Sequence, residues 1–350
     1  MKRILVVIAF LILIAVAGTT IWAYRDLHKP IRHAKRGQYI EIPRGSSPAA
    51  VINKLHDEGI IQHKWPLAVY LKLSSGGAQL KAGEYDFTSP ITPLGVFARL
   101  REGEQRLLRL TIVEGWTRWD IASAMAKIPE LHLKDATSAL PLMDNVSLIS
   151  DLDPTATNLE GYLFPDTYEF PRDAKASDVI GYMVKRFRKE WKPDWTARAA
   201  ALGLSPREVV TVAALIETEA KLSAERPVIA SVIYNRLKKE MALAIDSSVI
   251  YASKLAGKWR NDGKVYKSDV DRRSPYNTRL NSGLPPGPIA SPGKSSLEAA
   301  INPAATDYLY YVREPSHNDG MHNFYNNETD FGNGVRALRL WEQQRDAAAK

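Results

Sequence analysis

The chain has 350 residues, of which 45% are hydrophobic and 25% charged, and it contains no cysteine. A chain without cysteine has no disulfide framework, thiolate metal site or cysteine nucleophile. The formal net charge is +8, and the 21 glycines and 21 prolines exclude a collagen-like or largely disordered chain. This length and composition predict a globular protein of two domains.

An uncharged segment of 21 residues runs from Ile4 to Tyr24 near the N-terminus. As a helix it is long enough to cross about 30 Å of hydrocarbon. A cleavable signal peptide is the alternative, because Ala15–Ala17 fits a small-residue cleavage site. Trp22 and Tyr24 lie at the end of the apolar segment, where a membrane–water interface is expected and aromatic residues are preferred. This favours a retained anchor. We therefore expect residues 4–24 to lie in a lipid bilayer.

The positive charge is concentrated next to this segment. Residues 1–36 hold seven Lys or Arg and one Asp, so they carry +6 of the net +8. A basic cluster beside a span suits anionic lipid headgroups, whereas nucleic-acid binding needs a basic face on the folded part, so no nucleic-acid partner is expected. Five cations follow the span and two precede it, which by charge counting favours a cytoplasmic body. That rule is weak for a long domain, so charge leaves the topology open.

The folded part begins with a strand, a turn and a helix that recur about seventy residues later. Residues 40–42 alternate as in a strand, and Ser47 caps a helix that opens with Pro48. Residues 110–112 and the cap Thr117 repeat this order. Chance recurrence of a common β-α pattern is one explanation, and a true structural repeat is the other.

Between the two copies the pattern predicts a helix over 65–73 and a strand over 83–87. The resulting β-α-α-β order resembles LysM, a small unit that grips glycan chains. We predict an α+β chain with an anchor and basic segment over 1–36, a LysM-like region over 37–156 and a mixed α/β domain over 157–350. At the start of the last domain, the aromatic segment 160–168 is either a packed turn or the lining of a sugar cleft.

The best-marked helix start lies at Ser205–Glu208, a capping box with Pro206 at the first helical position. The helix is expected to run to about Glu219. Glu217 lies on the same face as Val210 and Ala213, seven and four residues earlier.

Poor solvation on this face would raise the pKa of the Glu217 carboxyl and suit it to act as a general acid. The alternative is a solvated helix end or a salt bridge. Glu219 is expected to face elsewhere, and Glu225 and Arg226 are interpreted as an ion pair or a cap at the start of the next helix.

Further motifs follow in order: residues 228–237, 244–251, 274–278, 283–289, 308–312 and 322–324. Together with residues 160–168 they resemble the endolytic murein transglycosylases, the MltG or YceG-like family. The resemblance spans nearly the whole chain. It implies a single-pass enzyme of the bacterial cytoplasmic (inner) membrane, with its body on the extracytoplasmic side, that cuts peptidoglycan glycan strands internally. It also implies coupling to peptidoglycan synthases, and neither a cofactor nor a metal is expected.

The family's catalytic glutamate, in the segment 214–220, carries over onto Glu217. The resemblance implies that it protonates the bond between N-acetylmuramic acid and N-acetylglucosamine and then takes the proton of the muramic C6 hydroxyl. A 1,6-anhydro end results, which would terminate or size nascent strands. One carboxyl suffices for this reaction, with Asp246 as a candidate helper.

Candidate substrate-binding residues in the matching segments are Asn235, Asp246, Tyr276, Asn277 and His322. Four of them have structural alternatives: a helix-end hydrogen bond, turn chemistry for the pair 276–277, and a satisfied loop histidine. Two other functions remain open at this point. They are a non-catalytic peptidoglycan-binding scaffold and a muramidase that hydrolyses with water.

Overall fold

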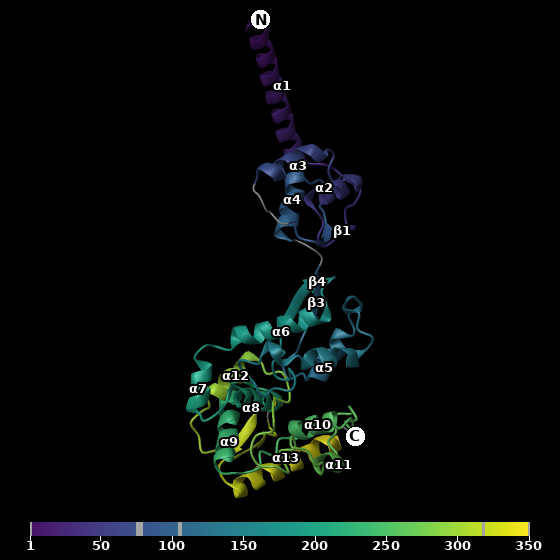
Figure 1. Ribbon diagram of the computed structural model, residues 1–350. Helices are drawn as coiled ribbons and strands as arrows, with labels where there is room; N and C mark the ends of the chain where they lie inside the picture. Colours follow the sequence, from purple (N-terminus) through teal and green to yellow (C-terminus); the bar gives the residue numbers. More distant parts are fainter. Residues whose placement is uncertain (1, 75–79, 104–106, 317–318, 349–350) are drawn as a thin grey trace. The chain divides into compact units, whose positions relative to one another are not determined.

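The computed structural model describes residues 2–74, 80–103, 107–316 and 319–348, and it mixes helices and strands as predicted (Figure 1). The chain forms two compact units, residues 1–108 with 169–174, and residues 109–168 with 175–350. Strand β3 (Leu107–Thr111) carries the chain from the first unit to the second, and β4 (Thr167–Pro171) begins its return; the two strands pair.

The first unit begins with α1 (Lys2–His28), which contains the predicted span. Its residues 3–28 include a window with a mean hydropathy of 2.9, none of it buried within the structure. The helix is thus long and apolar enough to cross a bilayer.

A β-α-α-β module follows, in the predicted element order. The strands β1 (Tyr39–Ile42) and β2 (Gly83–Asp86) are antiparallel, and α2 (Pro48–Asp57) and α3 (Lys64–Leu73) lie between them in sequence. After β2 comes α4 (Pro93–Glu102). The core is built from both strands and the helices, for example Ile40, Leu55, Tyr85 and Leu100, each at most 4% exposed. The likeness of this module to LysM itself stays a prediction.

The predicted strand-turn-helix repeat is present locally. Ser47 accepts a hydrogen bond from the Ala50 amide, and Thr117 accepts one from the Asp120 amide. Gly45 and Gly115 both have φ in the left-handed region, at 76° and 80°, which glycine adopts without steric cost. Beyond the cap the two copies differ. The strand of the second copy, β3, pairs with β4, and the helix of the second copy packs on a 3-10 segment.

The second unit is mainly helical. Its helices and remaining strands are α5 (Arg118–Met125), α6 (Ala176–Glu190), α7 (Trp195–Ala201), α8 (Pro206–Glu219), α9 (Arg226–Lys238), α10 (Asp246–Leu255), α11 (Lys267–Val270), α12 (Lys294–Ile301), β5 (Tyr310–Arg313), β6 (His322–Tyr325) and α13 (Glu328–Ala348). Strands β5 and β6 form an antiparallel pair with Arg313 opposite His322. Helix α8 packs against α7, α9, α10 and α12 at the centre of this unit (Figure 1).

The division between the units falls at 108/109, whereas the sequence suggested 156/157. Residues 129–148 form three 3-10 helices, η1 (Pro129–Leu131), η2 (Ala136–Asp144) and η3 (Val146–Leu148). They bury Leu131 and Met143, and the Leu159 amide donates to the Met143 carbonyl. Short 3-10 turns have no helical or strand periodicity, so the sequence pattern does not show that this segment packs with the second unit.

Candidate active site

Helix α8 holds the candidate catalytic turn in a fixed position. Its start is the predicted capping box, in which the Ser205 hydroxyl accepts from the Glu208 amide and the Glu208 carboxylate accepts from the Ser205 amide. Residues 209–216 are all buried, so the helix is surrounded by protein along this length. Its last turn then presents Glu217, Thr218 and Glu219 at the edge of the core.

The Glu217 side chain is only 4% exposed, so the predicted poor solvation is confirmed. Its carboxylate is nevertheless fully engaged. Oε1 accepts from Arg226 Nη2 at 2.8 Å, and Oε2 accepts from the Gly293 amide at 2.8 Å. The contact with Arg226 corresponds to the salt-bridge alternative for this residue. Glu217 therefore joins α8 to the beginnings of α9 and α12.

Arg226 is the centre of this network. Its Nε donates to Ser296 Oγ at 2.9 Å, its Nη1 donates to Ser223 Oγ at 2.6 Å, and its Nη2 lies 3.8 Å from Glu114 Oε2. The sequence correctly predicted that this arginine stands at the start of a helix, but it did not predict the ion pair with Glu217. A cation at a helix N-terminus opposes the helix dipole, and that conflict was the available signal for a tertiary partner.

Glu114 was not identified from sequence as a site residue. Its carboxylate lies against Gly293, where an added Cβ would collide with it. Burial and the neighbouring charge of Glu217 raise the pKa of Glu114, while Arg226 lowers it. Two carboxylates thus share one buried arginine, and Gly293 provides the close approach that this arrangement requires.

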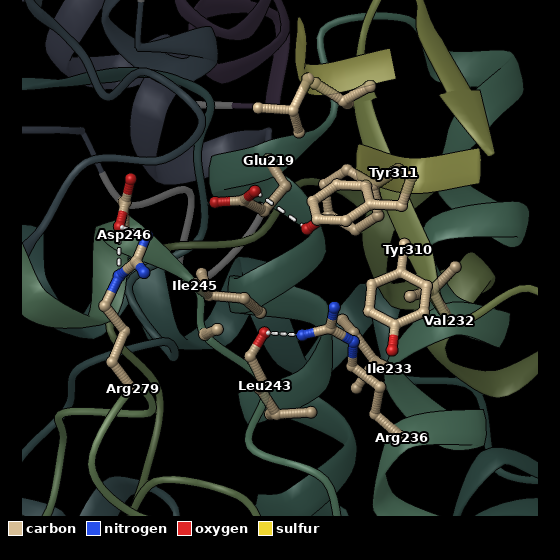
Figure 2. Close-up of a pocket in the computed structure, with 14 residues that line it drawn as sticks. Glu219, Val232, Ile233, Arg236, Leu243, Ile245, Asp246, Arg279, Tyr310 and Tyr311 are labelled. Carbon is tan, nitrogen blue, oxygen red and sulfur yellow. Dashed lines mark hydrogen bonds and ion pairs between the residues drawn. The ribbon is translucent and has the colours of Figure 1, made fainter. Parts of the chain in front are cut away.

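Glu219 enters a different environment. It lines a pocket of about 560 Å³ together with Arg236, Asp246, Arg279 and Tyr311 (Figure 2). The other residues of this lining are Val232, Ile233, Leu243, Ala244, Ile245, Tyr310, Val312, Phe331 and Val335. The volume lies within the range typical of small-molecule sites. From the sequence we expected only that Glu219 faces another side of the helix. The pocket itself could not be predicted, because distant segments of the chain form it.

The electrostatics of Glu219 suit a proton donor. Burial raises the pKa of its carboxyl, and the charge of Asp246 raises it further. The Tyr311 hydroxyl donates to Glu219 Oε2 at 2.9 Å and, like His322, lowers the pKa (Figure 2). The raising effects prevail, so Glu219 keeps its proton to a higher pH than an exposed glutamate. It thereby meets the two conditions of a general acid, a cavity and a raised pKa.

Two of the predicted substrate-binding residues lie at or beside this pocket. Asp246 lines it and forms an ion pair with Arg279, with 2.6 Å between Asp246 Oδ1 and Arg279 Nη2. The His322 ring lies 5.3 Å, between centroids, from that of Tyr311. Its Nδ1 is 2.9 Å from Glu225 Oε2. The structure therefore brings Asp246 and His322 toward Glu219.

The other three predicted residues hold the framework together. Asn235 Nδ2 donates to the carbonyls of Thr306 and Tyr308. Asn277 is fully buried, and its Nδ2 donates to the carbonyls of residues 270 and 272. Tyr276 packs against Tyr251 with 4.9 Å between ring centroids. None of the three belongs to the lining of the Glu219 pocket. Their roles in substrate binding stay predictions.

The aromatic segment 160–168 forms a packed turn. Tyr162 and Phe164 are at most 4% exposed, and Tyr168 is also buried. Glu160 is itself buried and accepts hydrogen bonds from the Arg118 amide and the Tyr251 hydroxyl. Burial raises the pKa of Glu160 to about 7. The burial of these side chains corresponds to the packed-turn alternative.

The model of the YceG-like family matches residues 40–337. The chain belongs to the YceG-like family. It is 35% identical over 305 residues to an endolytic murein transglycosylase of Bacillus subtilis (strain 168), covering 82% of each chain. A protein of the same name from Streptococcus pneumoniae serotype 2 (strain D39 / NCTC 7466) is 27% identical, with 94% of this chain matching 63% of the relative. The crystal structure of a YceG-like protein from Listeria monocytogenes aligns with a TM-score of 0.57 and 31% identity, covering 84% of this chain and 97% of the other.

Proposed function

We propose that this protein is an endolytic murein transglycosylase that cleaves the bond between N-acetylmuramic acid and N-acetylglucosamine inside glycan strands. Curated YceG-like relatives carry this name. The observation that carries the assignment is the position of Glu219, a carboxyl with a raised pKa that ends a buried helix inside a pocket. Tyrosine rings and paired polar side chains in that pocket suit stacking on sugar faces and hydrogen bonding to hydroxyl and acetamido groups.

In the proposed reaction Glu219 donates its proton to the glycosidic oxygen as the bond from the muramic C1 to that oxygen breaks. The resulting carboxylate then accepts the proton of the muramic C6 hydroxyl, whose oxygen forms a new bond to C1. The products are a 1,6-anhydro end and a free N-acetylglucosamine hydroxyl. Glu219 regains its proton, so no second carboxylate, metal or cofactor enters the balance.

Glu217 stays a sequence prediction for this role, and the geometry favours Glu219. Both oxygens of Glu217 accept hydrogen bonds from groups of the protein, one of them the charged Arg226. Arg226 and the Gly293 amide thus occupy both oxygens that a sugar oxygen would have to approach. Glu217 therefore suits a positioning role that fixes the end of α8.

Anchoring by α1 belongs to the same proposal. A glycan strand lies outside the cytoplasm, so the body would project from the outer side of the cytoplasmic membrane, where cleavage terminates or sizes nascent strands near their synthases. Charge counting favours the opposite orientation, and the length of the translocated body explains the exception. A scaffold without activity would gain nothing from a buried protonated carboxyl in a pocket, and a muramidase would need a second carboxylate for water.

The test is mass spectrometry of products released from purified peptidoglycan by the full chain in lipid vesicles. The unmodified protein, Glu219→Gln and Glu217→Gln are compared. We expect anhydro-muramyl products that fall about 10²–10⁴-fold with Glu219→Gln, the usual contribution of a general acid. Reducing-end products would convert the assignment to a muramidase, and no products would favour the scaffold. Loss with Glu217→Gln and retention with Glu219→Gln would restore Glu217 as the acid.

A further inference from the structure

Helix α3 has one buried face and one exposed apolar face. Pro66 and Leu67 are buried in the core of the first unit. On the other side Trp65, Val69 and Leu73 are 45%, 44% and 81% exposed. Their spacing of four residues places them along a single stripe of the helix. Three large apolar side chains in a row are more than the scattered exposure that is normal on a soluble surface.

This stripe adjoins the candidate membrane span. The ring of Trp65 stacks on that of Trp22 of α1, with 5.4 Å between centroids and 16° between planes. The neighbouring His63 lies 4.9 Å from Trp22, and its Nδ1 is 2.8 Å from Oδ1 of the buried Asp26. Helix α3 is therefore packed against the C-terminal turns of α1 (Figure 1).

The depth of this junction follows from helix geometry. At 1.5 Å per residue, the uncharged segment from Ile4 to Tyr24 spans roughly 30 Å, the thickness of the hydrocarbon core. With this segment in a bilayer, Trp22 lies at the boundary between acyl chains and headgroups, where tryptophan is preferred. Trp65, stacked on Trp22, must then lie at the same depth.

Both helices carry cations near this junction. Lys64 and Lys72 lie at the two ends of α3. Arg25 and Lys29 follow Trp22 on α1 and line with it a pocket of about 590 Å³. An apolar stripe bordered by lysine and arginine is the pattern of a helix lying in a membrane interface, because its cations reach the lipid phosphates.

We propose that α3 is an interfacial helix, which lies on the bilayer that α1 crosses and inserts Trp65, Val69 and Leu73 at the boundary between headgroups and acyl chains. The inference rests on the membrane anchoring that is part of the proposed function. Its consequence is that the β-α-α-β module is held flat against the membrane surface instead of hanging from a flexible stalk.

Site-directed spin labelling of the full chain tests this directly, because the protein has no native cysteine. Single labels are placed at Val69→Cys and Leu73→Cys in vesicles of phosphatidylethanolamine and phosphatidylglycerol. Tyr39→Cys, 49% exposed on β1 of the same unit, is the matched aqueous control. Ile12→Cys, in the middle of the apolar segment, reports insertion of α1. Each label's accessibility to oxygen is compared with its accessibility to a water-soluble nickel complex.

We expect the labels at 69 and 73 to shift toward oxygen accessibility, between the values at positions 39 and 12. Values at 69 and 73 equal to that at 39, with position 12 buried in lipid, would overturn the interfacial helix and leave the anchor intact. An aqueous value at position 12 would instead contradict the anchor itself. Spectral broadening caused by spin labels on different molecules, without a shift toward oxygen accessibility, would indicate that the stripe contacts a second copy of the chain. That result would overturn the proposal. Unchanged thermal unfolding of each labelled variant confirms that the module is folded.

Discussion

Glu217 and Glu219 end α8 in two unrelated environments, although only one residue separates them. Residues two positions apart on an α-helix point about 200° apart around its axis. Glu217 thus meets Arg226 and the Gly293 amide, while Glu219 meets the Tyr311 hydroxyl in a pocket. Glu217 is paired with an arginine, and burial raises the pKa of Glu219 in its pocket. This difference is the basis on which we propose Glu219 as the acid, while the catalytic role of Glu217 stays a sequence prediction.

Tyr311→Phe should move the alkaline limb of the activity profile to higher pH. The Tyr311 hydroxyl lowers the pKa of Glu219, so its removal lets the carboxyl keep the proton required for catalysis to a higher pH. The measurement is kcat/KM for release of anhydro products as a function of pH. Tyr310→Phe, which changes another tyrosine of the same pocket, is the control and should leave the limb in place. A limb that moves to lower pH with Tyr311→Phe would contradict the assignment of Glu219.

Asp246→Asn should move the same limb in the opposite direction. The charge of Asp246 raises the pKa of Glu219, and the substitution also leaves Arg279 without its carboxylate partner beside the pocket. Both effects favour the ionised form of Glu219, so activity is lost at lower pH than in the unmodified protein. Asp271→Asn, on an aspartate with the same 56% side-chain exposure that pairs with Lys267, is the control. An unchanged profile with Asp246→Asn would show that Asp246 does not tune the acid.

Glu217→Gln should destabilise the second unit. The substitution leaves the buried Arg226 guanidinium without its closest counter-charge, which costs roughly 1–3 kcal/mol of unfolding free energy. Denaturant unfolding monitored by tryptophan fluorescence gives the difference. Glu298→Gln removes the exposed pair with Lys192 and should change the stability by less than about 1 kcal/mol. Equal effects of the two substitutions would argue against a positioning role for Glu217.

Glu160→Gln should weaken the pH dependence of stability. Burial raises the pKa of Glu160 from 4.5 to about 7, so the folded state binds this proton more tightly than the unfolded state does. The resulting stability is fully present below pH 4.5 and is lost as the pH rises through about 7, an amount of about 3 kcal/mol. The glutamine variant lacks this titration and should gain stability relative to the unmodified protein between pH 5 and 8. Thermal unfolding of the two proteins is measured at pH 5 and at pH 8. An equal change of the unfolding midpoint between these pH values in both proteins would exclude the effect.

Features with local causes could be predicted from the sequence alone. The apolar segment 4–24, the capping box at Ser205 and the cap at Thr117 depend on residues within a few positions of one another. Side chains that bond the adjacent backbone leave a readable signal. The family motifs likewise identified the enzyme class from linear order alone.

The surroundings of Glu217 and Glu219 depend on contacts between segments that are distant in the sequence. The partner of Glu219 lies 92 residues away at Tyr311, and Glu217 is held by an amide 76 residues away at Gly293. Helical periodicity shows that two residues face different sides, but it does not show which side carries a cavity and which an arginine. Buried ion pairs and pockets form only when segments without local relation pack together. For that reason the helix could be predicted from the sequence, whereas the partners of its two glutamates could not.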